Sequence, residues 1–87
     1  MSNFRFLRQK EASDKFGLSK STFYQRIKEG LLPPPVQLGG RAVGWLEHEL
    51  AEVAKVIAFG STARELKLAV ETIVAHRISA QKNSEAA

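Results

Sequence analysis

Apolar and polar positions follow two different periods along this chain, and each change of period marks a boundary between elements. Apolar residues spaced three to four apart predict one helix from Arg8 or Gln9 to Phe16 and a second from Lys20 to Glu29. Gly17 and Gly30 follow these segments, where glycine often ends a helix because it takes positive φ without strain. Two short helices joined by a tight turn predict a helix-turn-helix.

The helical period returns in the second half of the chain. A third helix is expected from Leu46 to Phe59, with Gly60 after it. Thr62 and Glu65 have capping-box spacing, so a fourth helix is expected from there to about Ile78. The positions predicted to face inward are Ala12, Phe16, Phe23, Ile27, Leu46, Leu50, Val53, Ile57, Leu66, Ala69, Val70, Ile73 and Val74.

A different pattern separates the second and third helices. Pro33–Pro35 cannot extend a helix, and we interpret the run as a stiff spacer in preference to a docking motif for a proline-binding module. Alternation over Val36 to Trp45, interrupted by Gly39-Gly40, predicts a β-hairpin. Arg41 should lie near its tip. Trp45 is expected in the core because it shares a face with Val43.

Charge is divided unevenly between the two halves of the chain. Residues 1–45 hold eight Lys and Arg against three Asp and Glu, a net +5, whereas residues 46–87 hold five against six, a net −1. The positive charge thus coincides with the helix-turn-helix and hairpin, as expected for a protein that contacts nucleic-acid phosphates. On the second helix Ser21, Gln25, Lys28 and Glu29 are expected to point outward, with Lys20, Thr22, Tyr24 and Arg26 on the flanks. From these two sets and the hairpin tip come the DNA-binding candidates Lys20, Ser21, Thr22, Tyr24, Gln25, Lys28 and Arg41. Tyr24 fits partial burial as well as it fits DNA contact.

Other classes of function find little support. The 87 residues suffice for one domain, and the absence of cysteine excludes disulfides and thiolate metal sites. His48 and Glu52 share a helix face, but one histidine with one carboxylate makes a poor metal site, and His76 has no partner triad. No nucleophile elbow or phosphate loop is present. We therefore expect no enzyme activity, no metal, no cofactor and no membrane association, and a cytoplasmic location on the bacterial nucleoid.

Several motifs together resemble the AlpA family of prophage regulators. They are the run Gly17 to Tyr24, Ile27 to Gly30, Pro33 to Val36, Leu38 to Trp45, and Glu49-Leu50, so the resemblance covers about residues 4–57. It implies a small winged helix related to MerR-type domains and phage excisionases, which binds near integrase promoters or attachment sites. The recognition-helix positions carried over are Lys20, Ser21, Thr22, Tyr24 and Gln25, and the wing position is Arg41. Family members often have a basic residue where Gln25 stands, and this departure should alter sequence preference.

The fold expected is therefore mainly α: a winged helix-turn-helix with a two-stranded hairpin wing and an additional C-terminal helix. We divide it into residues 1–60, the DNA-binding domain, residues 61–78, the C-terminal helix, and residues 79–87, a flexible tail. The apolar stripe of the fourth helix either folds back on its own domain or pairs with another copy. We favour pairing because Val56 and Phe59 add nearby apolar surface.

The expected function is sequence-specific DNA binding that regulates a prophage or genomic island, as a transcriptional regulator, an excisionase-type recombination directionality factor, or both. The partners expected are double-stranded DNA, further copies of the chain, and integrase or RNA polymerase. The alternative is a terminase small-subunit-like protein that recognises DNA for packaging. A protein-binding adaptor without DNA is disfavoured by the basic first half.

Overall fold

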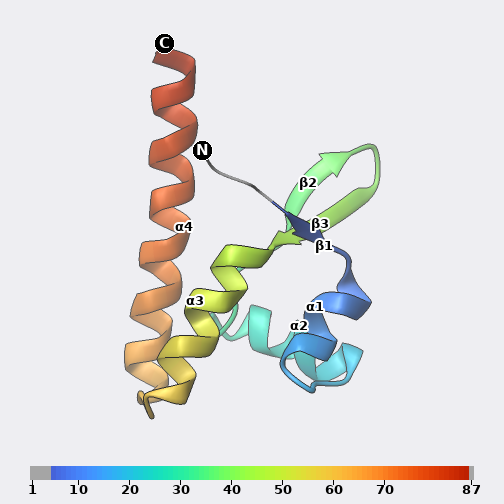
Figure 1. Cartoon of the computed structure of the whole chain (residues 1–87), viewed down its shortest axis with the longest axis vertical. Coiled ribbons are helices and arrows are strands. Elements are labelled where there is room, and N and C mark those ends of the chain that lie inside the picture. The colour runs from blue at the N-terminus through green and yellow to red at the C-terminus, as the bar shows by residue number, and fades with distance from the viewer. Residues whose placement is uncertain (1–4, 87) are drawn as a thin grey trace.

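The computed structural model describes residues 5–86, and the side chains of residues 5–77 (Figure 1). Its elements are β1 (Phe6–Leu7), α1 (Gln9–Lys15), α2 (Lys20–Lys28), β2 (Val36–Gly39), β3 (Ala42–Leu46), α3 (Glu47–Ala58) and α4 (Ala63–Ala86). All four helices and the hairpin expected from the sequence are present, so the mainly helical winged helix-turn-helix is confirmed. None of the described helices is long and apolar enough to cross a membrane.

The helix ends follow the local signals in the sequence. The Ser19 hydroxyl accepts a hydrogen bond of 3.3 Å from the backbone N–H of Thr22, which caps α2. Gly17 and Gly30 have φ of 66° and 81°, as expected for residues that end helices. At α4 the backbone N–H of Thr62 donates to Glu65 Oε1 at 2.9 Å, and the N–H of Glu65 donates to the Thr62 hydroxyl at 3.2 Å. The predicted capping box is thus confirmed.

The sheet has three antiparallel strands in the order β1-β3-β2, one more than the expected hairpin. β1 pairs with β3 in the register Leu7↔Trp45, on the side of β3 opposite to β2. The sequence of Phe6 and Leu7 predicts a short extended segment that packs on the core, and Leu7 is indeed buried, but the pairing of this segment with β3 was not predicted. The hairpin turn is formed by Gly40 and Arg41, because Gly39 still pairs with Ala42. The turn therefore lies one residue later than Gly39-Gly40 predicted, and Arg41 is in the turn itself.

Gly44 occupies the middle of β3 because its two neighbouring strands leave no room for a side chain. A Cβ at this position would lie 2.9 Å from Leu38 Cδ1, 3.3 Å from the carbonyl oxygen of Leu7 and 3.3 Å from Phe6 Cβ. The Leu38 side chain can move, but the Leu7 carbonyl belongs to the backbone that pairs with β3. The sequence alone does not show why a glycine is needed here, since the pairing of β1 with β3 was not predicted.

The core lies between the sheet and the helices and is centred on Phe23, Trp45, Leu50 and Val53, each at most 1% exposed. The rings of Phe23 and Trp45 meet edge to face, with centroids 5.1 Å apart. The placement of Trp45 in the core is therefore confirmed. The prediction for Ile57 was wrong, because its side chain is 44% exposed. The inward stripe of α3 continues from Val53 to the half-buried Val56, three residues on, which faces the core that α4 completes.

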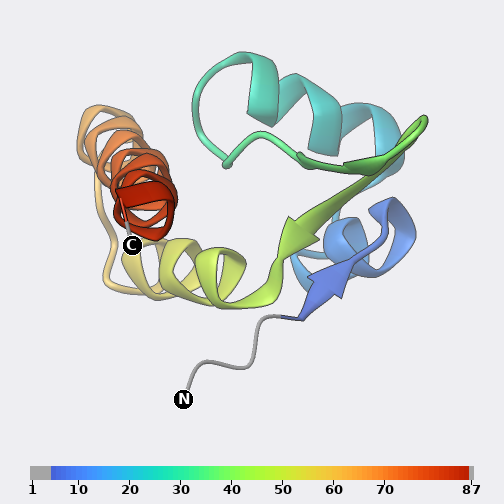
Figure 2. The ribbon, with the colours of Figure 1, turned by 90° about the horizontal axis from the view of Figure 1, so that it is seen from above.

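α4 turns back after Gly60 and packs along α3, as both views show (Figures 1 and 2). Leu66, Val70 and Ile73 are each at most 8% exposed and belong to the same buried cluster as Phe23 and Trp45. The stripe is thus covered by its own domain, and the preference for pairing through it was wrong. Self-association through another surface stays a prediction. The helix also continues to Ala86, beyond the end expected near Ile78.

Candidate nucleic-acid interface

The predicted DNA-binding positions of α2 all lie on its exposed face. Phe23 is fully buried and Ile27 half-buried, so the opposite side of the helix is presented to solvent. The exposed candidates are Lys20, Ser21, Thr22, Tyr24, Gln25 and Lys28, and Arg41 in the hairpin turn is exposed too. These seven residues are called the reading surface below. Their positions agree with the sequence analysis, while their contact with DNA stays a prediction.

The hairpin turn and the beginning of α2 lie on the same side of the molecule. In both views they are on the side away from α4 (Figures 1 and 2). β3 leads directly into α3, whose first residue is Glu47, so the sheet fixes the hairpin to the rest of the domain. A helix and a hairpin that project together can enter neighbouring grooves of one duplex.

Two side chains of the reading surface already make hydrogen bonds within α2. Gln25 Nε2 donates to Glu29 Oε2 at 3.2 Å, one helical turn on. The Thr22 hydroxyl accepts from Ser19 Oγ at 3.0 Å as part of the helix cap. Glu29 therefore restrains the Gln25 amide while leaving its carbonyl oxygen and second N–H without a partner in the described chain.

Tyr24, for which the sequence left burial and DNA contact open, is partly buried and partly exposed. Its ring meets those of Phe23 and Trp45 edge to face, with centroids 5.9 Å and 6.1 Å away. The residue is nevertheless 40% exposed, so one side packs on the core and the other faces solvent beside Gln25.

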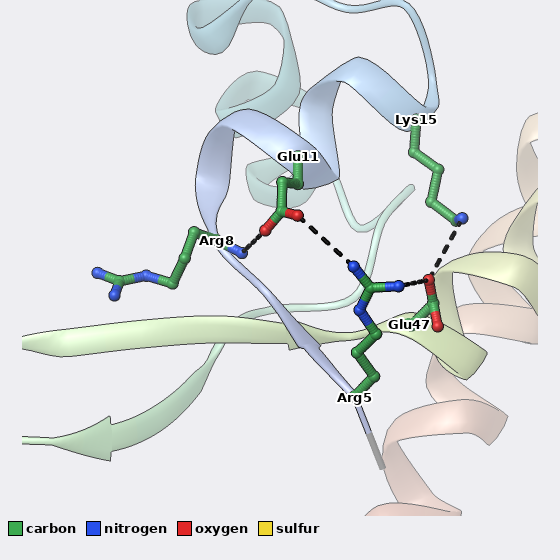
Figure 3. Close-up of polar contacts among 5 residues, drawn as sticks. All are labelled: Arg5, Arg8, Glu11, Lys15 and Glu47. Atoms are coloured by element: carbon green, nitrogen blue, oxygen red, sulfur yellow. Dashed lines mark hydrogen bonds and ion pairs between the residues drawn. The ribbon is translucent and has the colours of Figure 1, made fainter. Parts of the chain in front are cut away.

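Three bases around α1 are neutralised within the protein. Arg5 Nη2 lies 3.8 Å from Glu11 Oε2, and Arg5 Nη1 lies 3.5 Å from Glu47 Oε2 (Figure 3). Lys15 Nζ lies 3.9 Å from the same Glu47 oxygen. Lys10 pairs with Asp14 at 3.1 Å. These contacts join the segment before α1, α1 itself and the start of α3.

The remaining bases of the first half form no ion pair with any described residue. They are Arg8, Lys20, Arg26, Lys28 and Arg41. Lys55, Arg64 and Lys67 also form no ion pair within the described residues, but they share α3 and α4 with Glu52, Glu65 and Glu71. Three of the five unpaired bases in the first half belong to the reading surface. That surface is therefore positively charged, because it contains three bases and none of them is paired with an acidic residue of the described chain.

A buried ion pair between α3 and α4 was not predicted from the sequence. Glu49 is 3% exposed. Arg77 Nε donates to its Oε2 at 3.0 Å and Arg77 Nη2 donates to its Oε1. Arg77 Nη2 also donates to the carbonyl oxygen of Pro34 at 3.2 Å. The partners are 28 and 43 residues apart, so no local pattern could reveal them. The contact to Pro34, together with burial of Pro33, supports the spacer interpretation of the prolines.

A groove of about 330 Å³ between α3 and α4 is lined by His48, Glu52, His76 and Arg77, among others. In the part of the chain that the structure describes, no three His, Asp or Glu side chains are grouped as a metal site requires.

Comparison with known proteins decides the family. A family model described as "Prophage CP4-57 regulatory protein (AlpA)" matches residues 5–55. The chain belongs to the AlpA family. The uncharacterized protein ORF88 of Enterobacteria phage P4 is 50% identical over 46 residues, which are 53% of this chain and 52% of that protein. The chain thus spans about half the length of this curated relative. No solved structure matches it.

The AlpA match includes α1, α2, the hairpin and most of α3, and it ends before α4. The resemblance inferred from the motifs is therefore confirmed: the family model is that of a prophage regulatory protein. Since α4 lies outside the match, its packing against the AlpA region is known from the structure alone.

Proposed function

We propose that this AlpA-family protein binds specific DNA sites and regulates a prophage or genomic island, through transcription, through excision, or through both. The observation that carries the proposal is the reading surface: an exposed helix face and a hairpin turn on the same side, where Lys20, Lys28 and Arg41 have no ion-pair partner among the side chains that the structure describes. Phosphates supply most of the affinity in such complexes, and base edges supply the specificity.

In this proposal α2 lies in the major groove. Gln25 accepts from the N6 amino group of adenine through its carbonyl oxygen and donates to N7 through its free N–H. The hydrogen bond to Glu29 restrains the amide before DNA arrives, which lowers the entropic cost of ordering it. Arg41 in the hairpin turn contacts the adjacent backbone or narrow minor groove.

One such domain reads few base pairs, so we propose that several copies bind adjacent sites, bend the DNA or recruit integrase or RNA polymerase. Because Leu66, Val70 and Ile73 of the α4 stripe are buried in their own domain, we propose that this assembly uses another surface. The same burial gives no support to the packaging alternative, which would need α4 as an assembly helix.

The test begins by selecting binding sites from a random duplex pool with the purified protein. Binding to the selected duplex and to a scrambled duplex is then measured by fluorescence anisotropy. Gln25→Ala should weaken binding to the selected duplex roughly tenfold and leave binding to the scrambled duplex unchanged, because one bidentate base contact is lost.

Two results would contradict the proposal at different levels. If the wild-type protein enriches no sequence and does not bind duplex DNA at low salt, the proposed function is wrong. If Gln25→Ala loses affinity equally for both duplexes, DNA binding stands but Gln25 does not read a base. Circular dichroism of the variant checks that α2 is still formed.

A further inference from the structure

We propose that Arg8 is a phosphate-binding residue that contacts the DNA backbone beside the reading surface. The inference rests on the proposed DNA binding and adds a residue that the sequence analysis did not place at the interface. Arg8 lies between β1 and α1 and its side chain is exposed. Its guanidinium makes no ion pair with any described residue.

The orientation of Arg8 separates it from the bases around it. Figure 3 shows its guanidinium pointing away from Glu11 and Glu47, toward the side from which β3 comes. β3 starts at Ala42, directly after the hairpin turn with Arg41. The side chain therefore extends in the direction of the hairpin and not toward the acidic residues that join α1 to α3.

The nearby carboxylates are already engaged, which explains why Arg8 is left unpaired. Glu11 accepts the backbone N–H of Arg8 at 3.3 Å and pairs with Arg5. Glu47 pairs with Arg5 and Lys15. Each of the other bases in Figure 3 thus has an internal acid, whereas the Arg8 guanidinium keeps all its donors for an external one.

The backbone from which Arg8 projects is held in place on both sides. Its N–H is bonded to Glu11, and its carbonyl oxygen accepts the N–H of Ala12 at 2.9 Å. α1 packs against β1, β3 and α2, so this position is at the junction of the helix-turn-helix and the sheet. A fixed origin reduces the entropy lost when a long side chain binds a ligand.

The chemistry of an unpaired guanidinium at this junction fits the phosphates of duplex DNA. A helix in the major groove and a hairpin at the adjacent minor groove leave a ridge of phosphates between them. The planar fork of Arg binds two phosphate oxygens at once. Arg8 would fix the orientation of the domain on the duplex and would carry no sequence information itself.

The experiment measures binding of a labelled random-sequence duplex of about 20 base pairs over a range of KCl, since non-specific affinity comes mostly from phosphates. Arg8→Ala should lower affinity at low salt roughly fivefold and reduce the slope of log K against log salt by about 0.9. The matched control is Lys10→Ala, which removes one positive charge from the same region. Unlike Arg8, Lys10 is paired with an acidic residue, Asp14. Lys10→Ala should leave the slope unchanged. Arg8→Lys should keep the wild-type slope with weaker binding, because the charge remains and the fork is lost.

Equal slopes for wild type and Arg8→Ala, or equal reductions for Arg8→Ala and Lys10→Ala, would overturn the assignment while leaving DNA binding intact. A wild-type protein that does not bind the duplex would overturn both this inference and the proposed function. Urea unfolding of each variant shows whether the domain remains folded. If Arg8→Ala unfolds, the slope of Arg8→Lys against that of a folded Arg8→Gln decides the question.

Discussion

On α2, Lys20 and Lys28 are exposed and make no ion pair with the described residues, while Phe23 and the half-buried Ile27 pack into the core from the opposite side of the helix. On α4, Arg77 is turned inward to Glu49, whose carboxylate is buried. The two helices thus treat their positive charges in opposite ways. A base with a buried internal partner fixes one element to another, while an exposed base without a partner is available to a ligand.

The same comparison explains what α4 contributes. Its stripe belongs to the same buried cluster as Leu50 and Val53 of α3. Arg77 on α4 donates both to Glu49 of α3 and to the carbonyl oxygen of Pro34, just before the hairpin. The element outside the AlpA match therefore completes the core on which the matched region rests. Its effect on DNA binding would come from holding the hairpin and α2 in place.

The largest loss of stability is expected when charged side chains replace two buried residues of the α4 stripe. Val70→Glu with Ile73→Glu should destabilise the domain by more than about 4 kcal/mol, because two unpaired carboxylates would enter an apolar cluster. Thermal unfolding followed by circular dichroism should show no cooperative transition. The control is Leu68→Glu on the same helix, where the side chain is 56% exposed and the substitution should be tolerated.

A different outcome would show that the α4 stripe is not buried in its own domain. If the double variant stays folded and instead loses self-association in sedimentation, the stripe faces another copy in solution. The difference between the inward face of α4 and the exposed face of α2 would then not hold.

The buried and exposed faces of α2 could be predicted from the sequence, whereas the packing of α4 could be predicted only in part. Phe23 and Ile27 define the face of α2, and Ser19 and Gly30 define its ends, all by local spacing. The stripe of α4 was also visible, but periodicity cannot tell which apolar surface covers it. The Glu49–Arg77 pair and the pairing of β1 with β3 depend on partners distant in the sequence, so no local signal predicts them.

A smaller loss of stability is expected from breaking the buried ion pair. Arg77→Met should reduce the free energy of unfolding by about 3 kcal/mol, because it leaves the Glu49 carboxylate buried without a partner. Urea unfolding measures it. Lys67→Met, at an exposed unpaired base of α4, should have little effect.

The double variant Glu49→Leu with Arg77→Met should recover most of that loss, since replacing a buried pair with apolar residues is often close to neutral. A destabilised double variant would locate the role of Arg77 in its bond to the Pro34 carbonyl. Under conditions where these variants remain folded, the salt dependence of DNA binding should equal that of the wild type. An altered salt slope would mean that Arg77 also contributes to the interface.

The smallest effect is expected at the exposed start of α4, where Glu65 acts without burial. The Thr62 backbone N–H, and to a lesser extent the Thr62 hydroxyl, hold the pKa of Glu65 below its ordinary value of 4.5. A carboxyl group whose folded pKa is lowered stabilises the fold above its unfolded pKa, and this contribution disappears as pH falls through the folded pKa. The wild type should therefore be slightly more stable than Glu65→Gln at pH 7, and the difference should vanish below the folded pKa. Urea midpoints of both proteins across that range measure the difference, with Glu71→Gln on the same helix as the control.

A difference that persists in acid would come from the shape of the side chain and not from its charge. Even then, the losses of stability would decrease from the charged stripe through the broken Glu49–Arg77 pair to Glu65→Gln. Buried contacts would thus contribute more than exposed charges to holding α4 on the domain.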